Sequence, residues 1–457
     1  MNALILSAIL GVIMMFSGIV LKEKRIVRNI AITGILLILA SNIIESGGIS
    51  FFHIDTKGMM VFDRFALLFN SIAFGCTLIY FLLSAKDMEK VGVNYADYFS
   101  LIFFILCGIT LTSSFRSLLI LFLGIEIISI PLYILTGSDK KNLKSNEASL
   151  KYFLMGAFST GLMLMGIAFI YGATGTFSTE TMNIGTEKPT HLLIAGVFLL
   201  LFSMSFKVSA APFHFWAPDV YDGAPTVFTS FMATIVKAAA FIAFVRLFDN
   251  AFGNLQSEWQ LLVAIITAAT LFIGNITAVF QQSVKRMLAY SSISQAGFMM
   301  LAVYALNADA KEGLLLYSAA YSLATIGVFA VLIKLKDYTY DGFNGFAKHQ
   351  PLLAATTTIF LLSLAGIPLT AGFLSKFYML KATIFNSQHL WLVIFAVLMA
   401  AVSVYYYFRV IQAMYFKEAK EQTIEVSAAF KWVSVLLAGI IILLGIFPNL
   451  LLYWFYF

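Results

Sequence analysis

Apolar residues occur along this chain in long runs, without the strict alternation that is typical of half-buried strands. A bilayer core of about 30 Å needs roughly 20 apolar residues per helix, and runs of this length recur throughout. They predict an all-α polytopic membrane protein with about fourteen spans. The expected limits are 2–21, 27–45, 61–84, 97–114, 116–136, 147–171, 191–215, 225–248, 258–280, 286–306, 312–335, 351–388, 390–416 and 431–453.

The connections between these runs are too short for a soluble domain, and their charges predict the orientation. Connections after odd-numbered spans hold 17 of the 29 Lys and Arg residues; they are 22–28, 86–90, 138–144, 284–286, 334–348 and 417–431. Short basic loops stay on the cytoplasmic side of a membrane. We therefore expect a multi-pass protein of the cell (inner) membrane, or of an energy-transducing organelle membrane, with both termini on the non-cytoplasmic side.

Composition agrees with a membrane protein: 61% of the residues are hydrophobic and only 11% are charged, whereas a soluble domain is nearer a quarter charged. The net charge of +6 is explained by the loops, so we expect no nucleic-acid partner. Cys76 and Cys107 lie in apolar runs without a metal-binding spacing, and we interpret them as small core residues.

Two ionisable residues, Glu126 and Lys237, lie in the middle of predicted spans. A charge at a helix centre costs roughly 2.5–3.5 kcal/mol on insertion scales, so both need an explanation. Either Glu126 forms a fixed ion pair with one lysine and locks helix packing, or these residues line a hydrated polar path. A single pair leaves the other intramembrane lysines without partners, which favours the path.

Two spans look interrupted beside a lysine. Lys207 is followed by Pro212, which removes a backbone donor, and a break at bilayer depth is tolerated only where it faces protein or water. The run 351–388 is too long for one straight span and contains a second break before Lys376, at Gly366, Pro368 and Gly372.

Paired breaks are typical of inverted-repeat transporters. They predict two five-helix repeats, helices 4–8 (97–248) and helices 9–13 (258–416), with helices 7 and 12 broken. The separation of Glu126 from Lys207 equals that of Gln295 from Lys376. Helices 1–3 (1–96) and a C-terminal helix 14 (431–457) complete a single transmembrane domain.

Other polar residues are open to two interpretations. Lys151 lies near the start of its span, where it either extends to the interface or joins the path. His214, at the first break, is either a proton relay or a hydrogen-bonded structural group. Tyr317 and Tyr321 are candidates for carrying protons between lysines, beside the serines of 291–294, or are packing residues.

Lysine suits a proton path because burial disfavours its ammonium form, whereas a nearby carboxylate favours it. Moving a carboxylate toward the amine therefore favours binding of a proton, and moving it away favours release of that proton. The chain has no GxGxxG, Walker loop, haem or iron–sulfur motif, and we expect no cofactor and no metal site. Energy for any pumping has to come from another subunit.

Several strings together resemble one family: LGIEIISIPLYIL, SLKYFLMGAFSTG, FKVSAAPFHFWAPDVYDGAPT, SVKRMLAYSSISQAGFM and AGIPLTAGFLSKF. They are similar to the antiporter-like membrane subunits of respiratory complex I, and best match the N-type, over nearly the whole chain. The resemblance implies fourteen helices in inverted repeats, with helices 7 and 12 broken. M- and D-type subunits typically carry glutamate where Lys376 stands, and L-type subunits add a long C-terminal helix.

By the same resemblance, Glu126 matches the glutamate that modulates the central lysine, and Lys207 matches the broken-helix lysine. Lys237 matches the connecting lysine, Lys376 the lysine on the exit side, and Lys151 a family lysine in helix 6. Gln295, a further candidate for the proton relay, stands where a histidine is common. This puts in doubt a relay that needs a titrating group there, although a glutamine can still hold water.

The resemblance implies a proton-translocating subunit of an NADH:quinone oxidoreductase, driven by quinone reduction elsewhere. Its partners would be neighbouring antiporter-like and small membrane subunits of complex I, and lipids. Two alternatives stay open: a subunit of a multisubunit cation/proton antiporter or membrane-bound hydrogenase, and an assembly scaffold that does not pump.

Overall fold

The computed structural model describes residues 1–182, 189–385, 389–418 and 426–456. Parts of the predicted span 351–388 and of the connections 172–190 and 417–431 lie outside these ranges. The described chain is helical, and pairing between extended segments is limited there to isolated bridges such as Met60 with Phe115.

The helices follow the apolar runs, and several begin at a capping side chain. Asp63 accepts a hydrogen bond from the Ala66 amide at 2.8 Å, and Ser283 and Ser427 cap two later helices; such caps satisfy free amides of the first turn. The elements are α1 (Asn2–Val20), α2 (Lys24–Ser46), α3 (Arg64–Val91), α4 (Tyr95–Ser114), α5 (Leu118–Thr136), α6 (Leu143–Thr174), α7 (His191–Lys207), α8 (Trp216–Gly223), α9 (Thr226–Phe231), the π-helical turn η1 (Met232–Val236), α10 (Lys237–Phe252), η2 (Gly253–Leu255), α11 (Gln256–Val279), α12 (Val284–Ala305), α13 (Ala308–Leu332), η3 (Tyr340–Phe343), α14 (Phe346–His349), α15 (Pro351–Ala365), α16 (Ala371–Phe385), α17 (Leu390–Phe416), α18 (Ala428–Ile446) and α19 (Asn449–Tyr456).

Within the described ranges, ten helical stretches are long and apolar enough to cross a bilayer. Two further apolar helices, α7 and α15, are shorter, with 17 and 15 residues. Each is the first part of a predicted interrupted span. The chain is a multi-pass, all-helical membrane protein.

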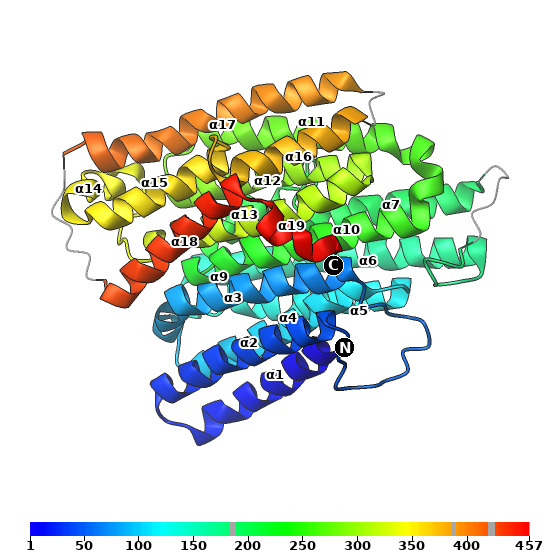
Figure 1. Cartoon of the computed structure of the whole chain (residues 1–457), viewed down its shortest axis with the longest axis horizontal. Helices are drawn as coiled ribbons and strands as arrows, with labels where there is room; N and C mark the ends of the chain where they lie inside the picture. The colour runs from blue at the N-terminus through cyan, green and yellow to red at the C-terminus, as the bar shows by residue number, and fades with distance from the viewer. Residues whose placement is uncertain (183–188, 386–388, 419–425, 457) are drawn as a thin grey trace.

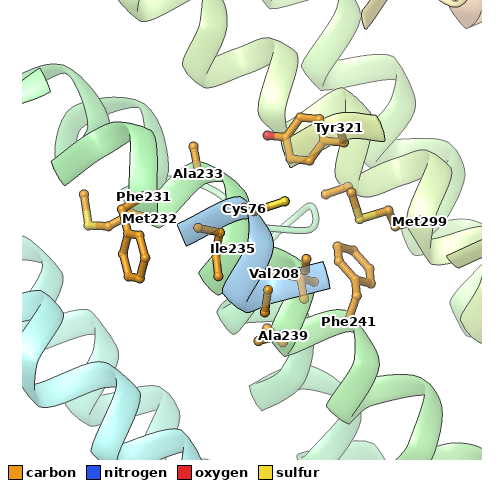
Figure 2. Close-up of a cluster of buried hydrophobic side chains, with 14 of the residues drawn as sticks. Cys76, Val208, Phe231, Met232, Ala233, Ile235, Ala239, Phe241, Met299 and Tyr321 are labelled. Carbon is orange, nitrogen blue, oxygen red and sulfur yellow. The ribbon is translucent and has the colours of Figure 1, made fainter. Parts of the chain in front are cut away.

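The helices lie side by side, with α1 and α2 at one edge and α17 and α11 at the other (Figure 1). The centre is formed by α13, whose apolar window is entirely buried inside the protein and which packs on α3, α9, α15, α16 and α18. Figure 2 shows part of this core, where Cys76 of α3 lies among Val208, Phe231 and Ile235. Cys76 is buried and Cys107 is partly buried, both as free thiols.

Both predicted interruptions fall within the bundle. α7 ends at Lys207 and α8 begins at Trp216, with the irregular segment that contains Pro212 between them. α15 ends at Ala365, Gly366 adopts a left-handed φ of +82°, and α16 begins at Ala371. Gly372 allows a close approach, because an added Cβ would overlap the Ser363 carbonyl.

The expected single C-terminal helix is wrong. α18 ends at Ile446, and Pro448 separates it from the short helix α19. Proline lacks an amide donor and disfavours a helical conformation in the preceding residue, which accounts for the break at Phe447.

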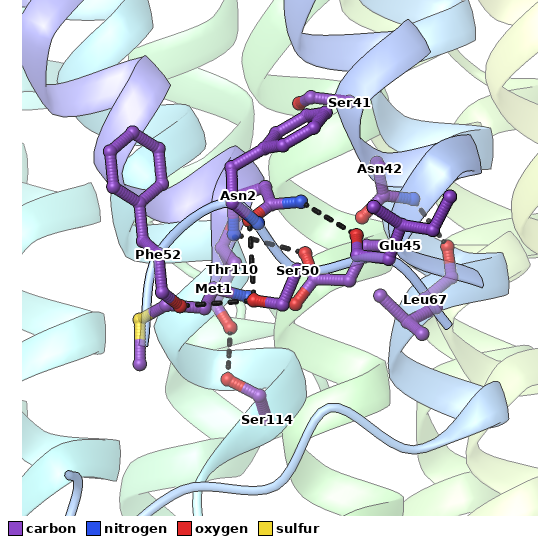
Figure 3. Close-up of polar contacts among 12 residues, drawn as sticks. Met1, Asn2, Ser41, Asn42, Glu45, Ser50, Phe52, Leu67, Thr110 and Ser114 are labelled. Carbon is purple, nitrogen blue, oxygen red and sulfur yellow. Dashed lines mark hydrogen bonds and ion pairs between the residues drawn. The ribbon is translucent and has the colours of Figure 1, made fainter. Parts of the chain in front are cut away.

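Polar contacts fasten the first helices to each other at one end of the bundle (Figure 3). The Met1 amino group lies 2.5 Å from Glu45 Oε1, and the Asn2 amide donates to Glu45 Oε2 at 3.0 Å. Asn42 of α2 donates to the Leu67 carbonyl of α3 at 2.8 Å. These bonds join α1 to α2 and α2 to α3, and they satisfy buried donors as a low-dielectric setting requires.

Candidate functional site

Glu126 and Lys207 are joined through a hydroxyl that belongs to a third helix. Thr160 Oγ1 of α6 donates to Glu126 Oε1 of α5 at 2.8 Å, and Lys207 Nζ of α7 donates to Thr160 Oγ1 at 3.2 Å. Lys207 Nζ also lies 3.2 Å from Ser129 Oγ, one turn after Glu126 on α5. Thr160 thus transmits an interaction between a carboxylate and an amine that do not touch.

Lys237 is 2% exposed and contacts both predicted repeats. Its Nζ donates to Ser209 Oγ at 2.8 Å, to the Ser292 carbonyl at 2.9 Å and to Ser292 Oγ. Ser209 follows the end of α7 and has a left-handed φ of +58°, whereas Ser292 lies on α12. The break in the first repeat therefore presents a hydroxyl to the amine.

The helix that carries Lys237 is itself irregular, because the π-helical turn η1 ends at Val236, immediately before the lysine. A π-turn inserts one residue into the helix and re-aims the side chains beyond it, and such turns are frequent at functional sites. The irregularity places the amine of Lys237 between Ser209 and Ser292.

Lys376 is 6% exposed and bonds to the second break. Its Nζ donates to the Leu364 and Ala365 carbonyls at 2.8 and 3.0 Å. These are among the last carbonyls of α15, which have no donor within their own helix. The broken helix thus supplies a partly negative end for the amine.

Gln295 shares the Leu364 carbonyl with Lys376. Its Nε2 donates to that oxygen at 2.9 Å and to Tyr407 OH at 3.1 Å, and its Oε1 accepts from Tyr317 OH. Gln295 therefore occupies, toward Lys376, the place that Glu126 occupies toward Lys207. In each case one intermediate oxygen separates the two side chains.

A cavity of about 10 Å³ borders Lys376, Gln295, Tyr317 and Tyr321. This is close to the volume of about 10–15 Å³ that one water requires. The Tyr321 hydroxyl is buried and forms no hydrogen bond within the described part of the chain, and it lies close to Ser292. Ser292, which bonds to Lys237, and Tyr321, which lines this cavity beside Lys376, are thus two polar groups of the region that contains both lysines.

Lys151 lies in a different polar cluster. Its Nζ pairs with Glu147 at 2.7 Å and with Asp219 at 3.1 Å, and its side chain is 43% exposed. Arg286 pairs with the same Asp219 at 3.2 Å. These ion pairs join α6, α8 and α12 near the end of the bundle and do not contact Thr160 or Lys207.

His214 is buried, and its Nδ1 has no hydrogen-bond partner among the described residues. No hydrogen bond joins it to Lys207 in those ranges. The predicted role of His214 as a proton relay therefore has no direct hydrogen bond to Lys207 to support it among the described residues.

Arg246 of α10 is a buried cation, 4% exposed, that was not predicted from the sequence. Its NH2 pairs with Asp63 Oδ2 at 2.9 Å, and its Nε donates to the Phe115 carbonyl at 3.0 Å. In contrast, Lys207, Lys237 and Lys376 have no carboxylate within 4.0 Å in the described part of the chain. Arg246 thus has a carboxylate partner within ion-pair distance, and the three lysines do not within the described ranges.

The bridging residues Thr160, Ser209 and Tyr407 were also missed. Serine, threonine and tyrosine are common in membrane helices, and many bond only to their own helix, as Thr267 does to the Val263 carbonyl. The sequence could have indicated Ser209, because it lies two residues after Lys207 at the break. No feature of the sequence distinguishes Thr160 or Tyr407.

This arrangement can accept an amine in either protonation state. An ammonium has three donors, and a neutral amine has two donors and one acceptor site. A serine hydroxyl can donate or accept, so Ser209 and Ser292 can turn their hydroxyls to suit either form of Lys237. Among the described residues, no group of His, Cys, Asp or Glu side chains is arranged to hold a metal ion.

Comparisons place this architecture among known proteins. Residues 116–403 match the family described as NADH:quinone oxidoreductase/Mrp antiporter, TM. The NADH-quinone oxidoreductase subunit N of Cytophaga hutchinsonii is 41% identical, with 99% of each chain covered. That of Flavobacterium psychrophilum is 38% identical over the same share of both chains.

Solved structures agree. A chain of respiratory complex I from Thermus thermophilus superimposes with a TM-score of 0.84 at 31% identity, over 98% of each chain. A chain of the Mrp complex from a Dietzia species has a TM-score of 0.87 at 17% identity, over 99% of this chain and 96% of that chain, and shows the fold alone. The chain therefore belongs to the family of NADH-quinone oxidoreductase subunit N, the N-type antiporter-like membrane subunits of respiratory complex I.

Proposed function

We propose that this chain is a proton-translocating membrane subunit of an NADH:quinone oxidoreductase, driven by quinone reduction in other subunits. Protons would pass along Glu126, Lys207, Lys237 and Lys376. The observation that carries the proposal is the state of Lys237 and Lys376, which are buried and, among the described residues, bonded only to hydroxyl and carbonyl oxygens. A buried amine without a counter-charge releases its proton far more readily than an exposed one.

Each amine is connected to the next by groups that can carry or hydrate a proton. Lys207 precedes Ser209 by two residues, and Ser209 bonds to Lys237. From Lys237 the connection runs through Ser292 toward Tyr321 and the small cavity beside Lys376. Several buried hydroxyls have no hydrogen-bond partner in the part of the chain that the structure describes, among them those of Ser205, Ser230, Ser294 and Thr325. They favour bound water, because buried polar groups are rarely left unsatisfied.

Glu126 is the modulator in this scheme. Its charge reaches Lys207 through Thr160, so a change in that hydrogen bond alters how strongly the ammonium of Lys207 is favoured. Lys151 forms its own ion pairs, and His214 has no hydrogen bond to Lys207 among the described residues. We propose supporting roles at most for both.

We propose further that two five-helix segments, residues 97–248 and residues 258–416, are inverted repeats within a fourteen-helix domain. Both termini would lie on the non-cytoplasmic side. Packing supports the repeats. α4 packs on α5 as α11 packs on α12, and α6 packs on α7 as α13 packs on α15 and α16. The basic loops support the orientation.

We also propose that the chain assembles with other membrane subunits of complex I, since its relatives at 37–41% identity are named as subunits of that enzyme. The alternative of a multisubunit cation/proton antiporter is weaker, because the Mrp complex chain shares the fold at only 17% identity. We expect the chain itself to need no cofactor.

The test is proton translocation and NADH:quinone activity in membrane vesicles that contain assembled complexes with Lys207→Ala or Glu126→Ala. Both variants should lose coupled activity by about tenfold or more, as expected for a positioned proton-transfer group. The matched control is Lys381→Ala, since Lys381 forms an ion pair with Asp309 at 2.9 Å and is 40% exposed. Full coupled activity in both variants, with the complex assembled, would contradict the proposal.

A further inference from the structure

A basic cavity of about 310 Å³ lies at one end of the bundle. α3 and α13 end there, and α2 and α18 begin there. The corresponding connections are four of the six basic loops that predict the cytoplasmic face. Side chains from all four helix ends line this one cavity. The loop sequences alone do not predict that these ends lie together.

Four basic residues line this cavity: Arg28, Lys86, Lys90 and Lys334. Asp87 pairs with Lys90 at 2.9 Å and with Lys334, and Glu89 pairs with Arg28 at 2.7 Å. Two carboxylates against four cations leave two positive charges uncompensated. Lys86 is exposed and has no hydrogen bond or ion pair within the described residues.

The wall below these charges is apolar. Ile32, Leu82 and Phe430 line the same cavity, and the ring of Phe430 lies beneath Lys334 Nζ at 5.0 Å. Leu82 is 47% exposed and lies one turn before Lys86 on α3, so the opening continues onto the outer, lipid-facing side of the bundle. A soluble anion would use only the basic rim, whereas this cavity also offers a surface for a hydrocarbon chain.

We propose that this cavity binds an anionic phospholipid, with the phosphate at Lys86, Lys90 and Arg28 and an acyl chain along Ile32 and Leu82. Basic pockets between helices on the cytoplasmic side suit anionic headgroups, and dispersion contacts with the apolar wall hold the chain. The lipid would link α2 to α3 and α18. This site is separate from the proton path, since none of its lining residues bonds to Lys207, Lys237 or Lys376 within the described ranges.

The test uses the full-length chain in neutral detergent, with native mass spectrometry to measure binding of phosphatidylglycerol, phosphatidylcholine and inorganic phosphate. The double variant Lys86→Gln/Lys90→Gln removes two exposed charges. We expect its phosphatidylglycerol affinity to fall about tenfold or more, because each basic group near an anionic lipid contributes about fivefold. The single variant Lys86→Gln breaks no contact of the described structure and should lose about fivefold.

The matched control is Lys140→Gln/Lys141→Gln, which removes two exposed lysines from another basic loop. It should change phosphatidylglycerol binding by less than about twofold, and phosphatidylcholine should bind every variant alike. Unchanged affinity in the first two variants would overturn the site. An equal loss in the control would show general attraction instead, and inorganic phosphate that displaces the lipid at similar concentration would show a free-anion site.

Discussion

The two halves of the polar row are built alike but carry different chemistry. In the first, Glu126 reaches Lys207 through the hydroxyl of Thr160. In the second, Gln295 reaches Lys376 through the Leu364 carbonyl. In both halves the lysine belongs to the interrupted helix pair, and its partner side chain lies on the second helix of the predicted repeat.

The difference lies in what each partner can do. A carboxylate changes the balance between ammonium and amine, whereas an amide cannot ionise and only orients hydrogen bonds. A threonine hydroxyl can turn, but the carbonyls at the end of α15 are held by the backbone. We infer that charge controls the first half, and that fixed geometry and hydration control the second.

The variant Glu126→Gln should have the largest effect, because it replaces the carboxylate of the first half by the amide that the second half has. We expect coupled NADH:quinone activity to fall about tenfold or more, since nothing would then modulate Lys207. Activity is measured in membrane vesicles, with assembly checked by a native gel. Near-normal activity would mean that the charge of Glu126 is not used.

The reverse variant, Gln295→Glu, places a carboxylate near Lys376. It would favour the ammonium and hold the proton there, and we expect coupled activity to fall about fivefold, equivalent to roughly 1 kcal/mol. The control Gln282→Glu adds the same charge at an exposed position. A loss of equal size in the control would show that position does not matter.

Thr160→Val removes the hydroxyl between Glu126 and Lys207 while keeping the side-chain volume. If the loss weakens the coupling of Glu126 to Lys207 by the worth of one hydrogen bond, about 1 kcal/mol at most, coupled activity should fall about twofold to fivefold. Thr160→Ser keeps the hydroxyl and should retain activity. If both variants behave alike, Thr160 is a packing residue.

Gly372→Ala tests the second break and should have the smallest effect on turnover, within about twofold. Its Cβ would overlap the Ser363 carbonyl, and overpacking of this kind destabilises by about 1–3 kcal/mol. A lower thermal unfolding midpoint of the assembled complex would show this. Gly161→Ala is the control, because an added Cβ there meets no atom within 4 Å.

Much of the fold follows from hydrophobic run length, because lipid leaves helices as the only stable form of a spanning segment in a protein of this kind. The predicted segment 390–416 coincides with α17. The π-turn before Lys237 could not be predicted, since one inserted residue leaves no mark on hydropathy. The break at Pro448 was present in the sequence but overlooked.

The charged members of the row were predictable because each pays a solvation penalty in lipid that only a special environment relieves. Their connecting groups were not. The bonds of Thr160, Ser209 and Tyr407 depend on which faces of distant helices meet. Helix periodicity does not predict which faces pack together. Arg246 was predictable in principle, but its ion pair with Asp63 joins residues 183 positions apart in the sequence.

The most direct test of the central claim is the number of protons moved per NADH oxidised in vesicles with Lys237→Arg, beside Lys237→Met. Lys237 bonds to both halves, and arginine keeps its proton where a station has to release it. The account predicts that both variants lose proton translocation and coupled quinone reduction, while assembly and NADH oxidation with an artificial acceptor persist. An unchanged proton-to-NADH ratio in Lys237→Arg, with loss only in Lys237→Met, would show a permanent structural cation and contradict it.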